Sequence, residues 1–178
     1  MTPPEILPTR RLVMQRPRIE DAAEMFQAYA QDPAVTRFLT WRPHRSLADT
    51  QLFLRASAPR WEEGTEHQWL LRRRDGALVG AIALRPKGFK AEIGYLIAQP
   101  HWRQGYATEA VCALIDWCWA QPEIYRVWAV CDIDNTASAR VMEKAGMQCE
   151  GILRRWMIHP NLGGQPRDCL CYARVKEG

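Results

Sequence analysis

A loop between a predicted strand and a predicted helix has the residue types of an anion-binding site. The strand covers residues 90–97, and residues 101–105, ending in Gln104 and Gly105, lead into a helix with a regular apolar stripe. Ligands of open α/β sheets lie beyond the carboxyl ends of the strands. The first amide groups of a helix are unpaired and lie at the positive end of its dipole, so a preceding glycine can complete a phosphate cradle. A glycine here also suits an ordinary loop, so this pair alone leaves both alternatives open.

The same strand carries a carboxylate among apolar neighbours. Strand alternation places Glu92, Gly94 and Leu96 on one face and four apolar residues on the other, in a run that reads as buried. Burying an unpaired carboxylate is costly. Glu92 is therefore either a structural ion-pair partner of an arginine or a catalytic base, because both arrangements perturb carboxylates. The pattern favours neither alternative.

Hydrophobic periodicity and turn signals predict the elements that position these residues. Ser46 opens one helix with an S-x-x-D capping box, and Gly146 closes another. The alternation of strands and helices in the second half predicts an α/β sheet that is partly parallel, within a single domain over residues 1–178. Strands are predicted at residues 9–15, 67–73, 77–85, 90–97, 125–131, 147–157 and 168–175, and helices at 19–30, 46–60, 107–118 and 136–145.

The composition is that of an ordinary globular domain. The chain has 178 residues, of which 47% are hydrophobic and 25% charged, and its longest apolar stretch, residues 77–84, is too short to span a bilayer. The net charge of +4 is too small to indicate a nucleic-acid-binding protein. The six cysteines form no C-x-x-C pair and the histidines lack metal-ligand spacing, so we expect reduced thiols and no metal. The sequence opens without a secretory pattern, and we expect a cytoplasmic protein with no membrane partner.

The wider string around Gly105 resembles the acetyl-CoA pyrophosphate loop of the GNAT superfamily of N-acetyltransferases. Residues 99–110 read Q-P-H-W-R-Q-G-Y-A-T-E-A, and the usual form of that loop is Q/R-x-x-G-x-G/A. Gly105 and Ala107 match its last two fixed positions, whereas Trp102 replaces the first. This replacement, followed by T-E-A, is similar to the branch that contains the ribosomal-protein N-terminal alanine acetyltransferases. The resemblance extends over most of the chain, through residues 9–12, 38–43, 91–95 and 135–147. No Walker P-loop and no G-x-G-x-x-G motif occurs.

The resemblance implies a GNAT-like α/β fold of mixed α+β character. We expect a central mixed, mostly antiparallel sheet of six to seven strands with a splayed parallel pair, flanked by about four helices. It implies acetyl-CoA as co-substrate and no metal, with the pantetheine arm between the strands at 90–97 and 125–131. The residues that the resemblance assigns to the cofactor are Leu96, Ile97, Ala98, Trp102, Arg103, Gln104, Gly105, Tyr106, Ala107, Thr108 and Asn135.

Three residues carry the catalytic and end-of-strand roles that the resemblance implies. Glu92 matches the glutamate that commonly deprotonates the acceptor amine, often through water. The family tyrosine that protonates the departing thiolate falls on Met142, and Ser138 is the alternative donor, acting by hydrogen bonding rather than by full proton transfer. Asn135 matches the asparagine that holds the cofactor or a water, although an asparagine directly before a helix is also an ordinary N-cap.

The expected function is acetyl-CoA-dependent N-acetyl transfer to a primary amine, by direct transfer in a ternary complex. The alternative is a catalytically silent acyl-CoA-binding or sensor module on the same fold. The acceptor remains open among a protein N-terminus, a polyamine, an amino acid and an amine-bearing antibiotic or peptide. Arg37, Phe38, Trp41 and residues 156–167 would flank it, by resemblance. We expect a monomer or a homodimer.

Overall fold

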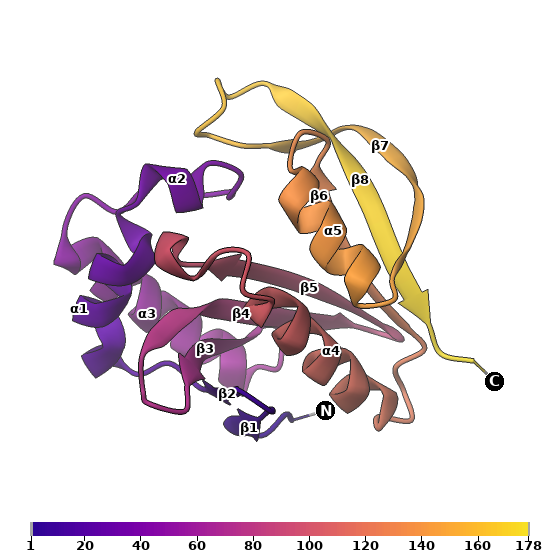
Figure 1. Ribbon diagram of the computed structural model, residues 1–178, viewed down its shortest axis with the longest axis horizontal. Coiled ribbons are helices and arrows are strands. Elements are labelled where there is room, and N and C mark those ends of the chain that lie inside the picture. The colour runs from indigo at the N-terminus through magenta and orange to yellow at the C-terminus, as the bar shows by residue number, and fades with distance from the viewer. Residues whose placement is uncertain (1, 178) are drawn as a thin grey trace.

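The computed structural model describes residues 2–177 as one eight-stranded sheet with helices on both faces (Figure 1). The strand order is β1-β2-β3-β4-β5-β6-β8-β7, and all neighbours are antiparallel except β5 and β6. The strands are β1 (Ile6–Pro8), β2 (Leu12–Gln15), β3 (His67–Arg73), β4 (Leu78–Lys87), β5 (Lys90–Ile97), β6 (Arg126–Asp132), β7 (Gln148–Ile158) and β8 (Pro166–Val175). The helices are α1 (Ala22–Met25), α2 (Pro33–Thr36), α3 (Leu47–Glu62), α4 (Tyr106–Trp119) and α5 (Thr136–Lys144).

The expected mixed, mostly antiparallel sheet with one parallel pair is confirmed, with one strand more than predicted. The extra strand, β1, has three residues and pairs with β2. All seven predicted strands are present. A three-residue strand of sequence Ile-Leu-Pro has no alternation to reveal it, which is why the pattern missed β1.

The predicted helix over residues 19–30 is broken into three short segments. A 3-10 turn (Ile19–Asp21) leads into α1, and a π-helical turn (Phe26–Ala30) follows. Asp32 and Pro33, which follow this segment, start α2: the Asp32 carboxylate caps it by accepting a hydrogen bond from the Ala34 amide. The capping box of α3 is present as predicted: Ser46 Oγ accepts from the Asp49 amide, and Asp49 accepts from the Ser46 amide.

Two apolar clusters lie on opposite faces of the sheet. Leu114 and Ile115 of α4 pack with Trp69, Leu71 and other sheet residues on one face. Leu70 lies between Trp69 and Leu71 on β3 and therefore faces the other side, where it belongs to a second cluster with the helical segments of residues 22–54. In Figure 1, α4 and α5 lie in front of the sheet. The helices α1 and α2 lie at the left of the view, and α3 lies behind the strands. No helix among residues 2–177 is long and apolar enough to cross a membrane.

The sheet ends at β7, a long edge strand with two irregularities. Its register with β8 shifts between Cys149 and Gly151 and again between Leu153 and Met157. Gly151 and Arg155, which lie within these shifts, both have positive φ angles, of 143° and 48°. The strand is exposed over most of its length, with Ile152, Trp156 and Ile158 each about half accessible.

Candidate active site

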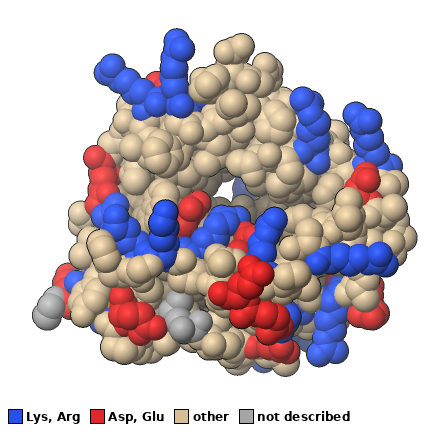
Figure 2. Space-filling view, turned by 180° about the vertical axis from the view of Figure 1, so that it is seen from behind, with Lys and Arg blue, Asp and Glu red and all other residues tan. Residues whose placement is uncertain are grey.

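The two parallel strands β5 and β6 separate after a short paired segment. Their register joins Lys90 with Arg126, Ala91 with Val127 and Glu92 with Trp128, the three pairs found among the described residues. Figure 1 shows the strands diverging from there, β5 toward the loop before α4 and β6 toward α5. The backbone of the last five residues of β5 is thus open to an extended ligand on the side that faces β6, as the splayed pair predicted. The space-filling view from behind shows a hollow near the middle of the molecule, with a band of charged side chains below it (Figure 2).

Some backbone groups at the end of β5 are already used within the protein. The Ala98 amide donates to the Val79 carbonyl at 2.9 Å, and the Ala98 carbonyl accepts from the His101 amide at 2.9 Å. The indole Nε1 of Trp102 donates to the Ile97 carbonyl at 2.6 Å. These bonds use both backbone groups of Ala98 and the carbonyl of Ile97, so they leave fewer groups at this end of β5 for a ligand. They also give Trp102 a structural task, namely to fix the loop against the strand.

The loop before α4 presents free backbone amides. Gly105 occupies the N-cap position with a φ of +79°, a conformation that glycine adopts without strain, and it has no side chain to cap the helix. The first four amides of a helix lack partners within the helix. Arg103 is exposed directly before this turn, whereas the Tyr106 and Ala107 side chains are buried, so these two present mainly their amides. Gln104 is also tied into the loop, through a bond from its Nε2 to the Pro100 carbonyl at 3.1 Å.

Glu109 in the first turn of α4 ties the N-terminal segment to this loop. One carboxylate oxygen accepts from the Thr9 hydroxyl and from the Arg11 amide, and the other accepts from Arg11 Nε, each at 2.6 Å. Arg11 in turn donates to the Gln104 carbonyl at 3.0 Å and lies over the Tyr106 ring. Burial acts to raise the pKa of Glu109, but the hydrogen bonds from Thr9 and Arg11 outweigh it and leave that pKa lowered. No local sequence pattern predicts this anchor, because its partners are about a hundred residues apart.

Ser138 lies in the first turn of α5, within reach of both strands of the open pair. Its amide donates to the Asn135 side-chain oxygen at 3.2 Å, so Asn135 caps the helix, as one of its two alternatives predicted. Tyr95 of β5 crosses the opening: its hydroxyl lies 3.0 Å from the Ser138 carbonyl and 2.9 Å from Ser138 Oγ. Met142, which stands where the family tyrosine would be, is fully buried in the core. The amide nitrogen of Asn135 takes no part in the cap.

A cysteine at the end of β6 adjoins the same serine. Burial raises the pKa of the Cys131 thiol to about 12, and neighbouring Cys169 adds to this, while a hydrogen bond with Ser138 opposes it. A thiol with a raised pKa is a poor nucleophile, because the reactive species is the thiolate. Cys131 therefore contributes bulk and a weak hydrogen-bonding group rather than a reactive centre.

Glu92 faces the opposite side of the sheet and belongs to a chain of ion pairs. Its carboxylate lies 3.6 Å from Arg85, which also pairs with buried Glu66 at 2.6 Å. Arg60 binds the other oxygen of Glu66 at 2.9 Å. Arg85 is thus the ion-pair partner that the structural alternative for Glu92 requires. The distance between the guanidinium and the carboxylate is long, however, and the Glu92 side chain is 29% exposed. The catalytic alternative also stands, because the carboxylate is exposed enough for water to reach it.

The two segments expected beside the acceptor lie against each other. Asn161, between β7 and β8, donates from Nδ2 to the carbonyls of Thr36 and Trp41, at 2.7 and 2.8 Å. His159 is 2% exposed; its ring meets Phe38 edge-on, and its Nε2 is 3.4 Å from the buried Asp132 carboxylate. A further residue of the same segment, Arg167, binds both oxygens of Asp132.

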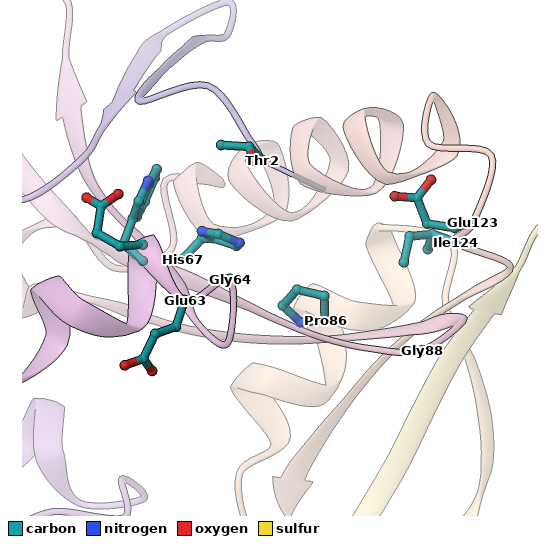
Figure 3. Close-up of a pocket in the computed structure, with 10 residues that line it drawn as sticks. Thr2, Glu63, Gly64, His67, Pro86, Gly88, Glu123 and Ile124 are labelled. Carbon is teal, nitrogen blue, oxygen red and sulfur yellow. The ribbon is translucent and has the colours of Figure 1, made fainter.

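A separate pocket of about 500 Å³ lies away from these residues. It is formed by the end of α3, the β4–β5 turn, the segment before β6 and Thr2 (Figure 3). His67 points into it and is 1% exposed, and its ring nitrogens have no hydrogen-bond partner among the described residues. The Glu63 carboxylate points away from the centre of the pocket in Figure 3. No sequence-predicted site residue lines it.

Comparison with known proteins agrees with this geometry. Residues 11–148 match the family described as the acetyltransferase (GNAT) domain. An uncharacterized N-acetyltransferase of Bacillus subtilis, YoaA, is 34% identical over 175 residues, covering 96% of this chain and 97% of that protein. A ribosomal-protein-serine acetyltransferase of Escherichia coli is 28% identical over 74% of this chain and 73% of its own. Among solved structures, the acetyltransferase MccE in complex with acetyl-CoA and AMP has a TM-score of 0.86 at 19% identity, covering 94% of this chain and 93% of that chain.

The family match spans more than half of the chain and includes the open strand pair, the loop before α4 and the first turn of α5. The prediction drawn from the loop and the other motifs is thereby confirmed: this chain belongs to the GNAT family of acetyltransferases.

Proposed function

We propose that the protein transfers the acetyl group of acetyl-CoA directly to a primary amine, with both substrates bound together. The observation that supports this most is the opening between β5 and β6. It adjoins the free amides of α4, Ser138 faces it from one side of the sheet, and Glu92 lies on the other. Coenzyme A would thus approach from the α4–α5 face, and the amine from the face of α1 to α3.

The residues of the loop fit the diphosphate of the co-substrate. The amides of residues 105–108 and the Arg103 guanidinium supply the positive groups that an anion needs at a helix start. The backbone at Gly105 has a positive φ, which glycine adopts without strain and which a residue with a Cβ does not, so glycine suits this close approach. The part of β5 that has no partner strand on its β6 side, which includes Leu96 and Ile97, would pair with the amides of the pantetheine arm in the manner of an added strand, with the Ile97 carbonyl shared with the Trp102 indole. The Asn135 amide nitrogen would reach the same arm.

The bound co-substrate supplies an activated acetyl group as a thioester. Only a neutral amine attacks it, and deprotonation at pH 7 costs about 1.2 kcal/mol for a protein α-amine but roughly 4.6 kcal/mol for a lysine. Glu92 accepts the amine proton in this proposal, through water. Arg85 lies 3.6 Å from its carboxylate. The easier reaction is therefore the one at an α-amine.

Ser138 stabilises the sulfur as the thioester bond breaks, by donating a hydrogen bond. Direct transfer is favoured over an acetylated enzyme because the nearby thiol, Cys131, is held protonated by burial. The acceptor is a primary amine that the segments around Phe38 and Asn161 recognise. The relationship to a ribosomal-protein-serine acetyltransferase supports a protein N-terminus as the acceptor. A polyamine, an amino acid and an amine-bearing antibiotic or peptide are the other acceptors to test. The protein would act in the cytoplasm, as a monomer or homodimer.

The test is thermal unfolding with acetyl-CoA, coenzyme A or NADPH added, followed by an assay of thiol release with a panel of amines. A ligand at about a hundred times its Kd stabilises by about 2.7 kcal/mol, which raises the midpoint by roughly 5 to 11 °C at this size. A shift with the two coenzyme A species but not with NADPH, together with amine-dependent thiol release, is the expected result. A shift without turnover on any amine would favour the catalytically silent acyl-CoA-binding module. The absence of any shift at millimolar ligand would refute the proposal.

A further inference from the structure

Tyr95 has no assigned role, although it bridges the opening in which the chemistry is proposed to occur. It lies three residues beyond Glu92, the last residue of β5 that pairs with β6. On the strand it points to the α5 side, whereas Glu92 points to the other face. Its hydroxyl meets two atoms of one residue, the carbonyl and the Oγ of Ser138.

The hydrogen atoms of this contact can be counted. A tyrosine hydroxyl has one hydrogen to donate, and a serine hydroxyl also has one. The Ser138 carbonyl can only accept, so Tyr95 donates to it at 3.0 Å, and the Ser138 hydroxyl then donates to Tyr95 Oη at 2.9 Å. Burial raises the pKa of Tyr95, although the bond to Ser138 opposes this, so the phenol keeps its hydrogen at neutral pH. Cys131, which also lies beside Ser138, has a hydrogen of its own on sulfur to donate. At rest the Ser138 hydrogen is therefore directed at Tyr95.

We propose that Tyr95 is a positioning residue for the acetyl transfer, which holds the Ser138 hydroxyl at rest and supports it when it turns to the leaving sulfur. The inference rests on the proposed function. As the amine nitrogen bonds to the acetyl carbon, the carbon–sulfur bond breaks and its electron pair stays on sulfur. The amine proton goes to Glu92 through water. Ser138 then donates its hydrogen bond to the sulfur, and Tyr95 turns its own hydrogen from the Ser138 carbonyl to the vacated Oγ. Neither hydroxyl loses its proton, and coenzyme A leaves as the thiolate.

This arrangement explains how a serine replaces a tyrosine as donor. A lone hydroxyl that turns to the sulfur leaves its own oxygen without a donor in a partly buried site. A second donor behind it polarises the first, because hydrogen bonds in a chain strengthen one another. Met142 cannot take either part, since it is apolar and buried. Tyr95 is the hydroxyl that the fold places next to Oγ, whereas Cys131 offers only a weak thiol donor there.

The experiment compares Tyr95→Phe, Ser138→Ala and the double variant, with Tyr172→Phe as matched control. Tyr172 also packs against α5 and donates to a side chain of that helix, Glu143, at 2.9 Å, but it does not contact Ser138. The probes are acetyl-CoA with a peptide bearing a free N-terminal alanine, or the best amine of the panel, read by thiol release. Coenzyme A alone serves for titration of its bound thiol by thiolate absorbance.

Tyr95→Phe is expected to lower kcat about five- to tenfold, the value of one hydrogen bond, with KM for both substrates within twofold. Ser138→Ala is expected to lower kcat about ten- to a hundredfold, and the double variant to match Ser138→Ala. The thiol of bound coenzyme A should titrate at higher pH in Tyr95→Phe than in wild type or in Tyr172→Phe.

Additive losses in the double variant, an equal loss in Tyr172→Phe or an unchanged thiol titration would each overturn the role of Tyr95. In those cases a wild type that binds coenzyme A and releases thiol would leave the proposed function intact. A wild type that binds no coenzyme A would overturn both.

Discussion

Replacing Glu109 by glutamine removes a negative charge from the first turn of α4 while nearly keeping the side-chain shape. The carboxylate accepts three hydrogen bonds and is only 15% exposed. Glutamine retains one accepting oxygen and turns an NH₂ group toward Arg11 Nε, so at least one charged bond is lost, worth about 1.5–3 kcal/mol. The loss of an acid at a helix start adds about 0.5 kcal/mol. Because Arg11 is 38% exposed, its charge adds little beyond this.

Glu109→Gln is therefore expected to lower the free energy of unfolding at pH 7 by about 2–3.5 kcal/mol, or the midpoint by roughly 4–14 °C. The pKa of Glu109 is lowered in the folded protein. Its contribution is thus fully present above the unfolded pKa of about 4.3, and it is lost as the pH falls through the folded value. Glutamine does not titrate, so the gap between the two proteins should close in acid.

Urea denaturation of both proteins from pH 7 down to pH 3 measures this gap. Glu150→Gln is the control, since Glu150 also pairs with an arginine but is 42% exposed, and its effect should be much smaller. A gap below about 0.5 kcal/mol at pH 7, or one that does not narrow in acid, would refute the reasoning. Acetyl-CoA binding should also weaken in Glu109→Gln, because Arg11 holds the Gln104 carbonyl of the loop.

Three other changes separate the remaining roles. Glu92→Gln should lower kcat most at low pH and recover as the pH approaches the pKa of the amine, whereas an equal loss at every pH would indicate a structural role through Arg85. Gly105→Val should abolish acetyl-CoA binding, measured by calorimetry, because a side chain at a φ of +79° blocks the backbone approach; retained affinity would mean that the diphosphate lies elsewhere. Asn161→Ala removes two hydrogen bonds to the segment that ends at Trp41 and should raise KM for the amine up to about thirtyfold, with acetyl-CoA affinity unchanged. Faster amide exchange over residues 36–44 should accompany it, and unchanged exchange would contradict this reading.

The sequence predicted elements whose signal is local. The apolar stripe of α4 and the box at Ser46 are set by residues three or four apart, so α3 and α4 lie where expected. The prediction of one continuous helix at residues 19–30 was wrong because local spacing does not distinguish types of helix. The apolar spacing of these residues is helical, but the backbone widens to a π-turn after Phe26, which a stripe of buried residues does not reveal.

The loop before α4 could be predicted because its residues are consecutive in the sequence, as they are in the family motif. The splayed pair of β5 and β6, whose residues are far apart in the sequence, was implied by the family resemblance. The bridge from Tyr95 to Ser138 could not be predicted, since it depends on how far β5 and β6 part. The same is true of Asn161, whose partners lie 120 and 125 residues away. Neither a tyrosine on a strand nor an asparagine in a turn carries a signal of what the fold brings next to it.

The two irregularities of β7 bear on how the protein behaves in a crowded solution. A straight edge strand presents a continuous row of unpaired backbone donors and acceptors to other protein chains. Exposed apolar side chains such as those of Trp156 and Ile158 would stabilise such a contact. At Gly151 and Arg155 the backbone turns out of line, so an incoming strand finds only short straight pieces to pair with. Arg154 and Arg155 add charge between the apolar residues. We therefore expect the bends to hinder aggregation through this exposed edge, and variants with a straightened β7 would test this by light scattering.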